Sequence, residues 1–319
     1  EQELISALTS GKVQQISSIT PENAKILKDK NYQIKSSVLP RVFGLYFNQN
    51  QNQIFTNKNV VQAMNLAIDK DKIVREVLGG YGVAIDDPIP PNMIAYQKLG
   101  EKDNSTKDEN LEKARQILAK DGWKIGVNGY LEKTTTIKKK KTTTNLEFSI
   151  STGNTTELAE TALLIKEDLT LLGVKVDVKT FETGNLNQSV IRPRKYDALL
   201  FGQIINHESD LFAFWHSTQR NDPGRNVAMY TNAKVDKILE DASTMTDEIS
   251  RIKKYAQFED EIKNDMPAIF LYSPEFIYLI SKDLKGISID HITSSSDRFL
   301  NSYSWYLKTD DIWEIFSKK

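Results

Sequence analysis

Cysteine is absent from the 319 residues of the chain. Its absence excludes structural disulfides, zinc–thiolate sites and thiol nucleophiles. No apolar run in the sequence approaches the ~20 residues of a membrane-spanning helix, and the longest apolar clusters, Ala268–Tyr272 and Phe276–Ile280, have the length of strands. Neither sign of charge dominates, with 42 basic and 43 acidic residues. Nucleic-acid binding, which needs clustered cations, is therefore not expected.

Sequence motifs of common catalytic and nucleotide-binding sites are also missing. There is no Gly-x-Gly-x-x-Gly fingerprint, no P-loop and no Gly-x-Ser-x-Gly elbow. His207, Glu208, Asp210 and His216 carry ligand types that suit zinc or nickel, but their spacing matches no compact metal motif. We therefore predict neither a metal nor a cofactor. A hydrolase that uses His207 and His216 stays open as an alternative.

Leu146–Val178 has the clearest local pattern in the chain. Apolar residues alternate at its start and at its end, as in strands. Between them, Thr155 or Thr156 caps a helix with apolar residues at helical spacing, which ends at Gly173. Strand, helix and strand in this order predict a parallel pair and an α/β fold.

Other patterns fill in the remaining elements. A hairpin is expected over Tyr130–Asn145, with Lys138–Lys141 interpreted as its solvated tip rather than as a patch for an anionic partner. The further predicted strands and helices are strands at Val42–Asn48, Tyr196–Phe201, Ala268–Tyr272 and Phe276–Ile280, and helices that begin near Asn57, at Asp69, at Ser105, at Lys234 and at Ser250.

Gly202–Tyr230 is the most unusual segment, because it is long for a connection and follows a predicted strand directly. In open α/β sheets, ligands bind beyond the carboxyl ends of the strands. The segment combines aromatic residues with amides and a cation, as recognition sites do, although its aromatics are also suited to a core beneath a loop. The candidate ligand-binding residues are Gln203, Asn206, Trp215, His216, Arg225 and Asn226.

Several segments in the same order resemble the peptide- and nickel-binding solute-binding proteins, extracellular family 5, over roughly residues 4–280. The matching segments are Phe55–Lys70, Ile73–Gly82, Pro88–Pro91, Ala114–Trp123, Tyr196–Ala198, Asn226–Asp236 and Asn264–Tyr272. The resemblance implies a periplasmic-binding-protein-like fold (class II, or cluster C), with one complete lobe plus part of the other. It places residues 1–41 in the first lobe and its hinge, 42–267 in the second lobe, and 268–319 back in the first lobe.

One departure from the family pattern bears on the ligand. Peptide binders of the family often carry an Asp shortly after the Tyr196–Ala198 strand, which holds the amino terminus of the peptide. When Glu208–Phe212 is aligned with the corresponding family motif, Ile205 stands at that position, and Ser209 replaces a proline. The resemblance thus supports a solute more firmly than a conventional peptide.

The function implied by the resemblance is that of the substrate-binding component of an ABC importer, which captures a solute, by default a peptide, and delivers it to a permease and its ATPase. A monomer outside the cytoplasm, without enzymatic activity, is expected. A sensory or receptor module on the same fold is the second alternative. Since the chain begins at Glu1 without a signal peptide, we expect a trimmed or incomplete chain that lacks its N-terminal membrane anchor.

Overall fold

A computed structural model describes residues 1–17, 19–28, 30, 32–93, 105–137, 140–289 and 292–307. The chain divides into two compact units. Unit 1 comprises Glu1–Leu39, Gly79–Tyr81 and Pro274–Lys319, and unit 2 comprises Pro40–Leu78 and Gly82–Ser273. The unit boundaries thus lie within a few residues of the positions 41 and 267 expected from the sequence. The assignment of these units to lobes of a binding protein stays a prediction.

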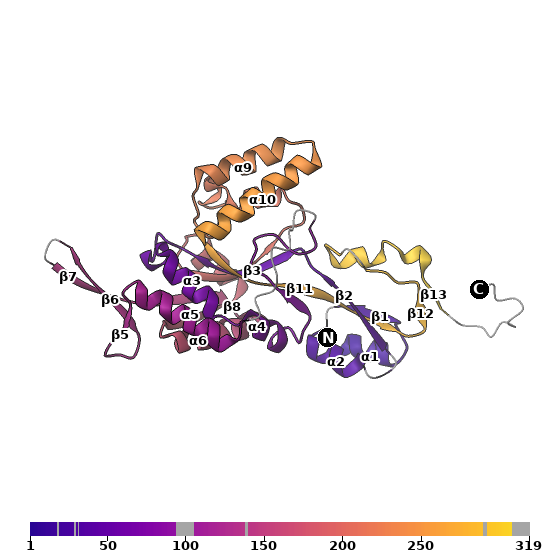
Figure 1. The fold of residues 1–319 in the computed structure, drawn as a ribbon. Helices are drawn as coiled ribbons and strands as arrows, with labels where there is room; N and C mark the ends of the chain where they lie inside the picture. Colours follow the sequence, from indigo (N-terminus) through magenta and orange to yellow (C-terminus); the bar gives the residue numbers. More distant parts are fainter. Residues whose placement is uncertain are drawn as a thin grey trace, which may run out of the picture. The chain divides into compact units, whose positions relative to one another are not determined.

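Unit 2 is built on a mixed sheet whose central strands come from distant parts of the chain (Figure 1). β3 (Arg41–Phe47) pairs antiparallel with β10 (Ala198–Ile204) and with the first half of β11 (Ala268–Ser281). On its other side, β10 runs parallel to β8 (Glu147–Gly153), which runs parallel to β9 (Lys175–Phe181). The predicted parallel pair and α/β fold are therefore confirmed.

Helices cover both faces of this sheet (Figure 1). One core packs the sheet against α3 (Lys58–Ala67), α5 (Lys107–Lys120) and α6 (Thr156–Leu172). The other packs it against α8 (Asp210–Trp215), α9 (Ala233–Thr244) and α10 (Glu248–Asp265). Capping residues fix several ends, among them the left-handed Gly173 that ends α6. At its other end, α6 begins just beyond the carboxyl end of β8.

The smaller elements of unit 2 include the predicted hairpin, formed by β6 (Leu131–Ile137) and β7 (Lys140–Asn145), which extends away from the sheet (Figure 1). Lys138 and Lys139 of its expected tip lie outside the described residues. The remaining elements of the unit are η1 (Gln53–Thr56), α4 (Lys70–Glu76), β4 (Gly82–Ala84), β5 (Lys124–Ile125), α7 (Thr183–Asn185), η2 (Leu186–Ile191) and η3 (Ser217–Gln219).

Unit 1 contains two helices, α1 (Gln2–Thr9) and α2 (Pro21–Lys28), and the strands β1 (Gln15–Ser17) and β2 (Tyr32–Val38). Both strands pair antiparallel with the second half of β11. The sequence predicted two separate strands here, but β11 is continuous through Pro274. That proline lacks a donor, and its carbonyl still accepts a hydrogen bond from the Leu39 N–H. The other elements of unit 1 are β12 (Leu284–Lys285), η4 (Ser295–Phe299), η5 (Ser302–Ser304) and β13 (Tyr306–Leu307).

A buried ionic cluster joins the loop after β4 to α10. The Lys263 ammonium lies against the carboxylates of both Asp87 and Glu259. Glu259 is only 1% exposed, and burial raises the pKa of its carboxyl, an effect that the nearby Asp87 strengthens and Lys263 opposes. The folded state therefore holds the Glu259 proton more tightly than the unfolded chain does, and the stability associated with this group falls as the pH rises above 4.5.

Replacement of this buried acid should make the folded protein less sensitive to alkaline pH. We expect Glu259→Gln to raise the free energy of unfolding relative to the wild type by at least about 1 kcal/mol more at pH 8 than at pH 5, since one pKa unit corresponds to about 1.4 kcal/mol. Urea titrations at the two pH values measure this difference. Asp260→Asn, at the exposed neighbouring position of α10, is the control and should show no such trend. A pH-independent difference for Glu259→Gln would contradict the prediction.

Candidate functional site

Gln203 and Asn206, the first two of the predicted ligand-binding residues, lie at the carboxyl end of β10. Gln203 is buried on the strand, and neither its amide nitrogen nor its amide oxygen has a hydrogen-bond partner in the described part of the chain. Asn206 is exposed just beyond the strand, where its backbone N–H donates to the Asp210 carboxylate. The buried, unpaired amide of Gln203 is costly unless another polar group reaches it.

Trp215 and His216 lie at the end of α8. Trp215 is fully buried, and its indole packs against four aromatic rings at centroid distances of 5.9–6.2 Å. The His216 ring stacks on Phe212, accepts a hydrogen bond at Nδ1 from the Thr218 backbone N–H, and places Nε2 3.5 Å from Glu240 Oε1. Both side chains thus belong to the packed interior of unit 2.

Asn226 organises the loop that follows. Its buried amide group donates to the carbonyls of Trp215, His216 and Tyr230 and accepts from the Tyr230 N–H. The structure therefore brings Trp215, His216 and Asn226 together, while the Arg225 side chain is exposed next to them in the chain. Each hydrogen bond that the Asn226 amide makes among the described residues is to a backbone group of the protein. Ligand binding by the six residues stays a prediction.

The histidine-based alternative finds no support in the geometry of the described residues. His207 is exposed, and its Nδ1 lies 2.9 Å from the Ser209 hydroxyl, while His216 is buried among α8 and α9. Within the described ranges, no group of three or more histidine, aspartate or glutamate side chains is arranged to hold a metal ion. His207 and His216 are thus held by separate local contacts.

A second group of polar and aromatic residues, which sequence reasoning missed, lies where β8 and β10 end. Arg41 and Phe43 are two residues apart on β3, and Phe43 pairs across the sheet with Gly202 on one side and with Tyr272 on the other. The Phe43 and Tyr272 rings stack at 4.8 Å. Glu157, in the first turn of α6, reaches the same place. We call Arg41, Phe43, Glu157 and Tyr272 the strand-end cluster.

A glycine is required beside this cluster. A Cβ atom at Gly202 would lie 2.7 Å from the Phe43 ring, closer than real contacts allow. The ring therefore lies directly over the Gly202 backbone and stacks on the buried Tyr272, so the half-buried Phe43 ring is the aromatic surface that stays accessible here. The surface lies at the carboxyl ends of parallel strands, where α/β sheets bind ligands.

The charges of the strand-end cluster are only partly balanced. The Tyr272 hydroxyl donates to Glu157 Oε1 at 2.9 Å. Burial raises the pKa of the Glu157 carboxyl, and the hydrogen bond from Tyr272 and the charge of Arg41 oppose this rise. The Nε atom of Arg41 is buried and has no partner among the described residues. A cation and an acid therefore face the same aromatic surface.

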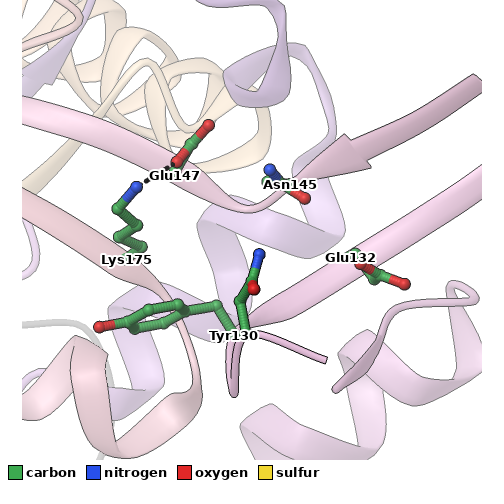
Figure 2. A pocket seen from close by; sticks show the side chains of 6 residues that line it. Tyr130, Glu132, Asn145, Glu147 and Lys175 are labelled. Atoms are coloured by element: carbon green, nitrogen blue, oxygen red, sulfur yellow. Dashed lines mark hydrogen bonds and ion pairs between the residues drawn. The ribbon is translucent and has the colours of Figure 1, made fainter. Parts of the chain in front are cut away.

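A separate small pocket of about 120 Å³ lies at the base of the hairpin (Figure 2). Its lining residues are Asn128, Tyr130, Glu132, Asn145, Glu147 and Lys175. The Lys175 ammonium lies 2.9 Å from the Glu147 carboxylate and lowers the pKa of that carboxyl (Figure 2). The two charges of this exposed pair balance each other, whereas the buried Nε of Arg41 in the strand-end cluster has no partner among the described residues. The pocket is therefore a weaker candidate for a charged ligand than the strand-end cluster.

Comparison with known families now decides what kind of protein carries this architecture. Residues 1–224 match the model of the bacterial extracellular solute-binding proteins, family 5, described as its middle region. The chain belongs to this family. Family 5 consists of solute-binding proteins, and its periplasmic-binding-protein-like fold agrees with the mixed sheet of unit 2. None of the helices in the described ranges has the length and apolar character needed to cross a bilayer.

Curated family 5 relatives carry names that refer to peptides and related solutes. The oligopeptide-binding protein AppA of Bacillus subtilis is 30% identical over 74% of this chain and 42% of its own length. The glutathione-binding protein GsiB of Pectobacterium atrosepticum is 28% identical over 88% of this chain and 52% of its own length. The chain thus spans about half the length of the curated relatives it matches.

Solved family 5 structures match almost the whole chain. AppA of B. subtilis, in complex with a nonapeptide, superposes with a TM-score of 0.73 and 26% identity, over 97% of this chain and 58% of AppA. NikZ of Campylobacter jejuni, in complex with Ni(L-His), superposes with a TM-score of 0.72 and 26% identity, over 95% and 59%. The predicted fold, with one complete lobe and part of another, is consistent with these matches.

Proposed function

We propose that the chain is the substrate-binding component of an ABC importer, that it acts outside the cytoplasm, and that it captures a peptide without catalysing a reaction. Delivery to a membrane permease and its ATPase would follow. The observation that carries the proposal is membership of family 5 over 70% of the chain, 224 of 319 residues. The names of the relatives favour a peptide: one binds oligopeptides, another glutathione.

The missing acid at Ile205 does not exclude a peptide ligand. The Ile205 side chain is fully buried, and its backbone N–H donates to the Pro40 carbonyl. An Asp at this position would be enclosed in the core of unit 2, so the departure at Ile205 removes no exposed group. Peptides are also bound through their main chain, by strand-like hydrogen bonding that needs no ammonium anchor.

The strand-end cluster adds a physical reason for solute binding. The half-buried Phe43 ring, backed by the buried Tyr272 ring, offers an apolar wall. Arg41 and Glu157 supply charge at the edge of that wall. Recognition sites commonly combine such walls with a few placed polar groups. No group of three or more His, Asp or Glu side chains in the described residues is arranged to hold a metal ion, so a metal-dependent reaction finds no support there.

Ligand screening tests this function. Thermal unfolding of the purified protein is followed with a mixture of short peptides, with glutathione, with Ni(L-His) and with buffer alone. A peptide present at 100 times its Kd should stabilise the fold by about 2.7 kcal/mol, equivalent to a rise in Tm of about 4 °C. If only Ni(L-His) stabilised the protein, the proposed ligand would be a metal chelate instead of a peptide. No shift with any of them would contradict the proposed function.

A further inference from the structure

Arg41 holds a positive charge that the described part of the protein leaves without a direct partner. No hydrogen bond reaches its guanidinium, and no carboxylate there lies within 4.0 Å of it, although its Nε is buried. Burying the Nε–H of a half-buried arginine without a hydrogen-bond acceptor costs free energy. An unpaired cation of this kind is tolerated more readily when an anion of a bound ligand can pair with it.

Glu157 is an internal candidate for that partner, because its charge interacts with that of Arg41, but it is engaged elsewhere. Its Oε1 accepts the hydrogen bond from Tyr272, and its influence on Arg41 is a charge interaction without direct contact. Burial also favours the neutral form of the Glu157 carboxyl, which reduces the charge that it offers to Arg41. Arg41 therefore keeps its capacity to form two parallel hydrogen bonds with one incoming group.

The chemistry of the incoming group follows from the guanidinium. Its planar arrangement of N–H donors matches a carboxylate with two parallel, charge-assisted hydrogen bonds. The half-buried Phe43 ring beside it, which stacks on the buried Tyr272, would cover an apolar or main-chain part of the same ligand. We propose that Arg41 is an anchor for a carboxylate of the bound peptide, a proposal that rests on the peptide-binding function above.

Two sources of carboxylate are possible in a peptide, its carboxyl terminus and an acidic side chain. The experiment separates them with two mixed libraries, from dipeptides to nonapeptides, one with free carboxyl termini and one with amidated termini. Peptides retained by the purified protein are identified by mass spectrometry, and affinities of retained sequences are measured by calorimetry. The variants are Arg41→Met, Arg41→Lys and, as a matched control on the exposed face of α4, Arg75→Met.

If Arg41 is the anchor, the wild type retains peptides with free termini, and it retains amidated peptides only where they contain Asp or Glu. Arg41→Met should weaken binding of the retained acids about 10- to 100-fold, as expected for loss of a charged hydrogen bond. Arg41→Lys should fall between the two, and Arg75→Met should bind as the wild type does. Since the Arg41 side chain makes no hydrogen bond among the described residues, Arg41→Met should keep the wild-type Tm.

Three results would overturn the assignment in distinguishable ways. Equal retention of both libraries, with unchanged affinity in Arg41→Met, would remove Arg41 as an anchor and leave peptide binding intact. Failure of the wild type to retain any peptide of either library would overturn the peptide-binding function together with the anchor. A lower Tm of Arg41→Met without ligand would assign Arg41 a structural role through Glu157 instead.

Discussion

Trp215→Ala should destabilise the fold by about 3 to 5 kcal/mol, the range seen when a large buried aromatic side chain is truncated. Trp215 is fully buried and touches the rings of Tyr46, Tyr230, Phe258 and Phe270, which come from β3, the loop before α9, α10 and β11. Removing the indole would leave a cavity at the point where these elements meet. The free energy of unfolding, measured by urea titration with circular dichroism, checks this expectation.

Trp215→Phe is the informative companion variant. The indole Nε1 is buried without a hydrogen-bond partner among the described residues, so a phenyl ring loses volume but no hydrogen bond. We expect Trp215→Phe to cost less than half as much as Trp215→Ala. If Trp215→Phe were as unstable as Trp215→Ala, the expectation that the indole nitrogen makes no stabilising hydrogen bond would be contradicted.

Asn226→Ala should cost about 3 kcal/mol of stability, although it removes only a small polar side chain. Four hydrogen bonds between the Asn226 amide and the backbone would be lost, each worth about 1 kcal/mol net, and buried backbone groups would be left unpaired. Because two of these bonds hold the carbonyls of Trp215 and His216, the loop after α8 should loosen first. Hydrogen exchange of the amides in residues 215–230 would report this local opening.

The control for this variant lies in the same loop. Asn221 is exposed, and Asn221→Ala should change the free energy of unfolding by no more than about 0.5 kcal/mol. A similar loss in both variants would mean that the loop is sensitive to any substitution. Asn226→Asp offers a second comparison, since it keeps the acceptor for the Tyr230 N–H while removing the two N–H donors of the amide.

The elements with strong local signals could be predicted from the sequence alone. The cap at Thr155, the apolar spacing of α6 and the stop at Gly173 are all local, and β8, α6 and β9 were predicted for this reason. By contrast, β1 and β2 were not predicted. β1 is short, and β2 has no fully buried position, so neither carries the alternation that marks a half-buried strand.

The strand-end cluster could not be predicted because its members meet only through tertiary pairing. Phe43 and Tyr272 are more than two hundred positions apart and come together by the antiparallel register of β3 with β11. Periodicity tells which side of a strand faces a core, but it does not tell which strand lies next to which. For the same reason, Trp215 and Asn226 could be singled out as unusual, whereas their buried positions depended on the packing of α8 and its loop.

The continuity of β11 has a consequence for how the polypeptide is made. β1 and β2 pair in the described structure with residues 275–281 of β11, which are synthesised after the whole of unit 2. Most of unit 2 can be completed before those partners exist. β1 and β2 therefore lack these partners while unit 2 is being synthesised, and contacts between such distant segments form slowly. During biogenesis, these two strands thus need protection from wrong partners until the second half of β11 is available.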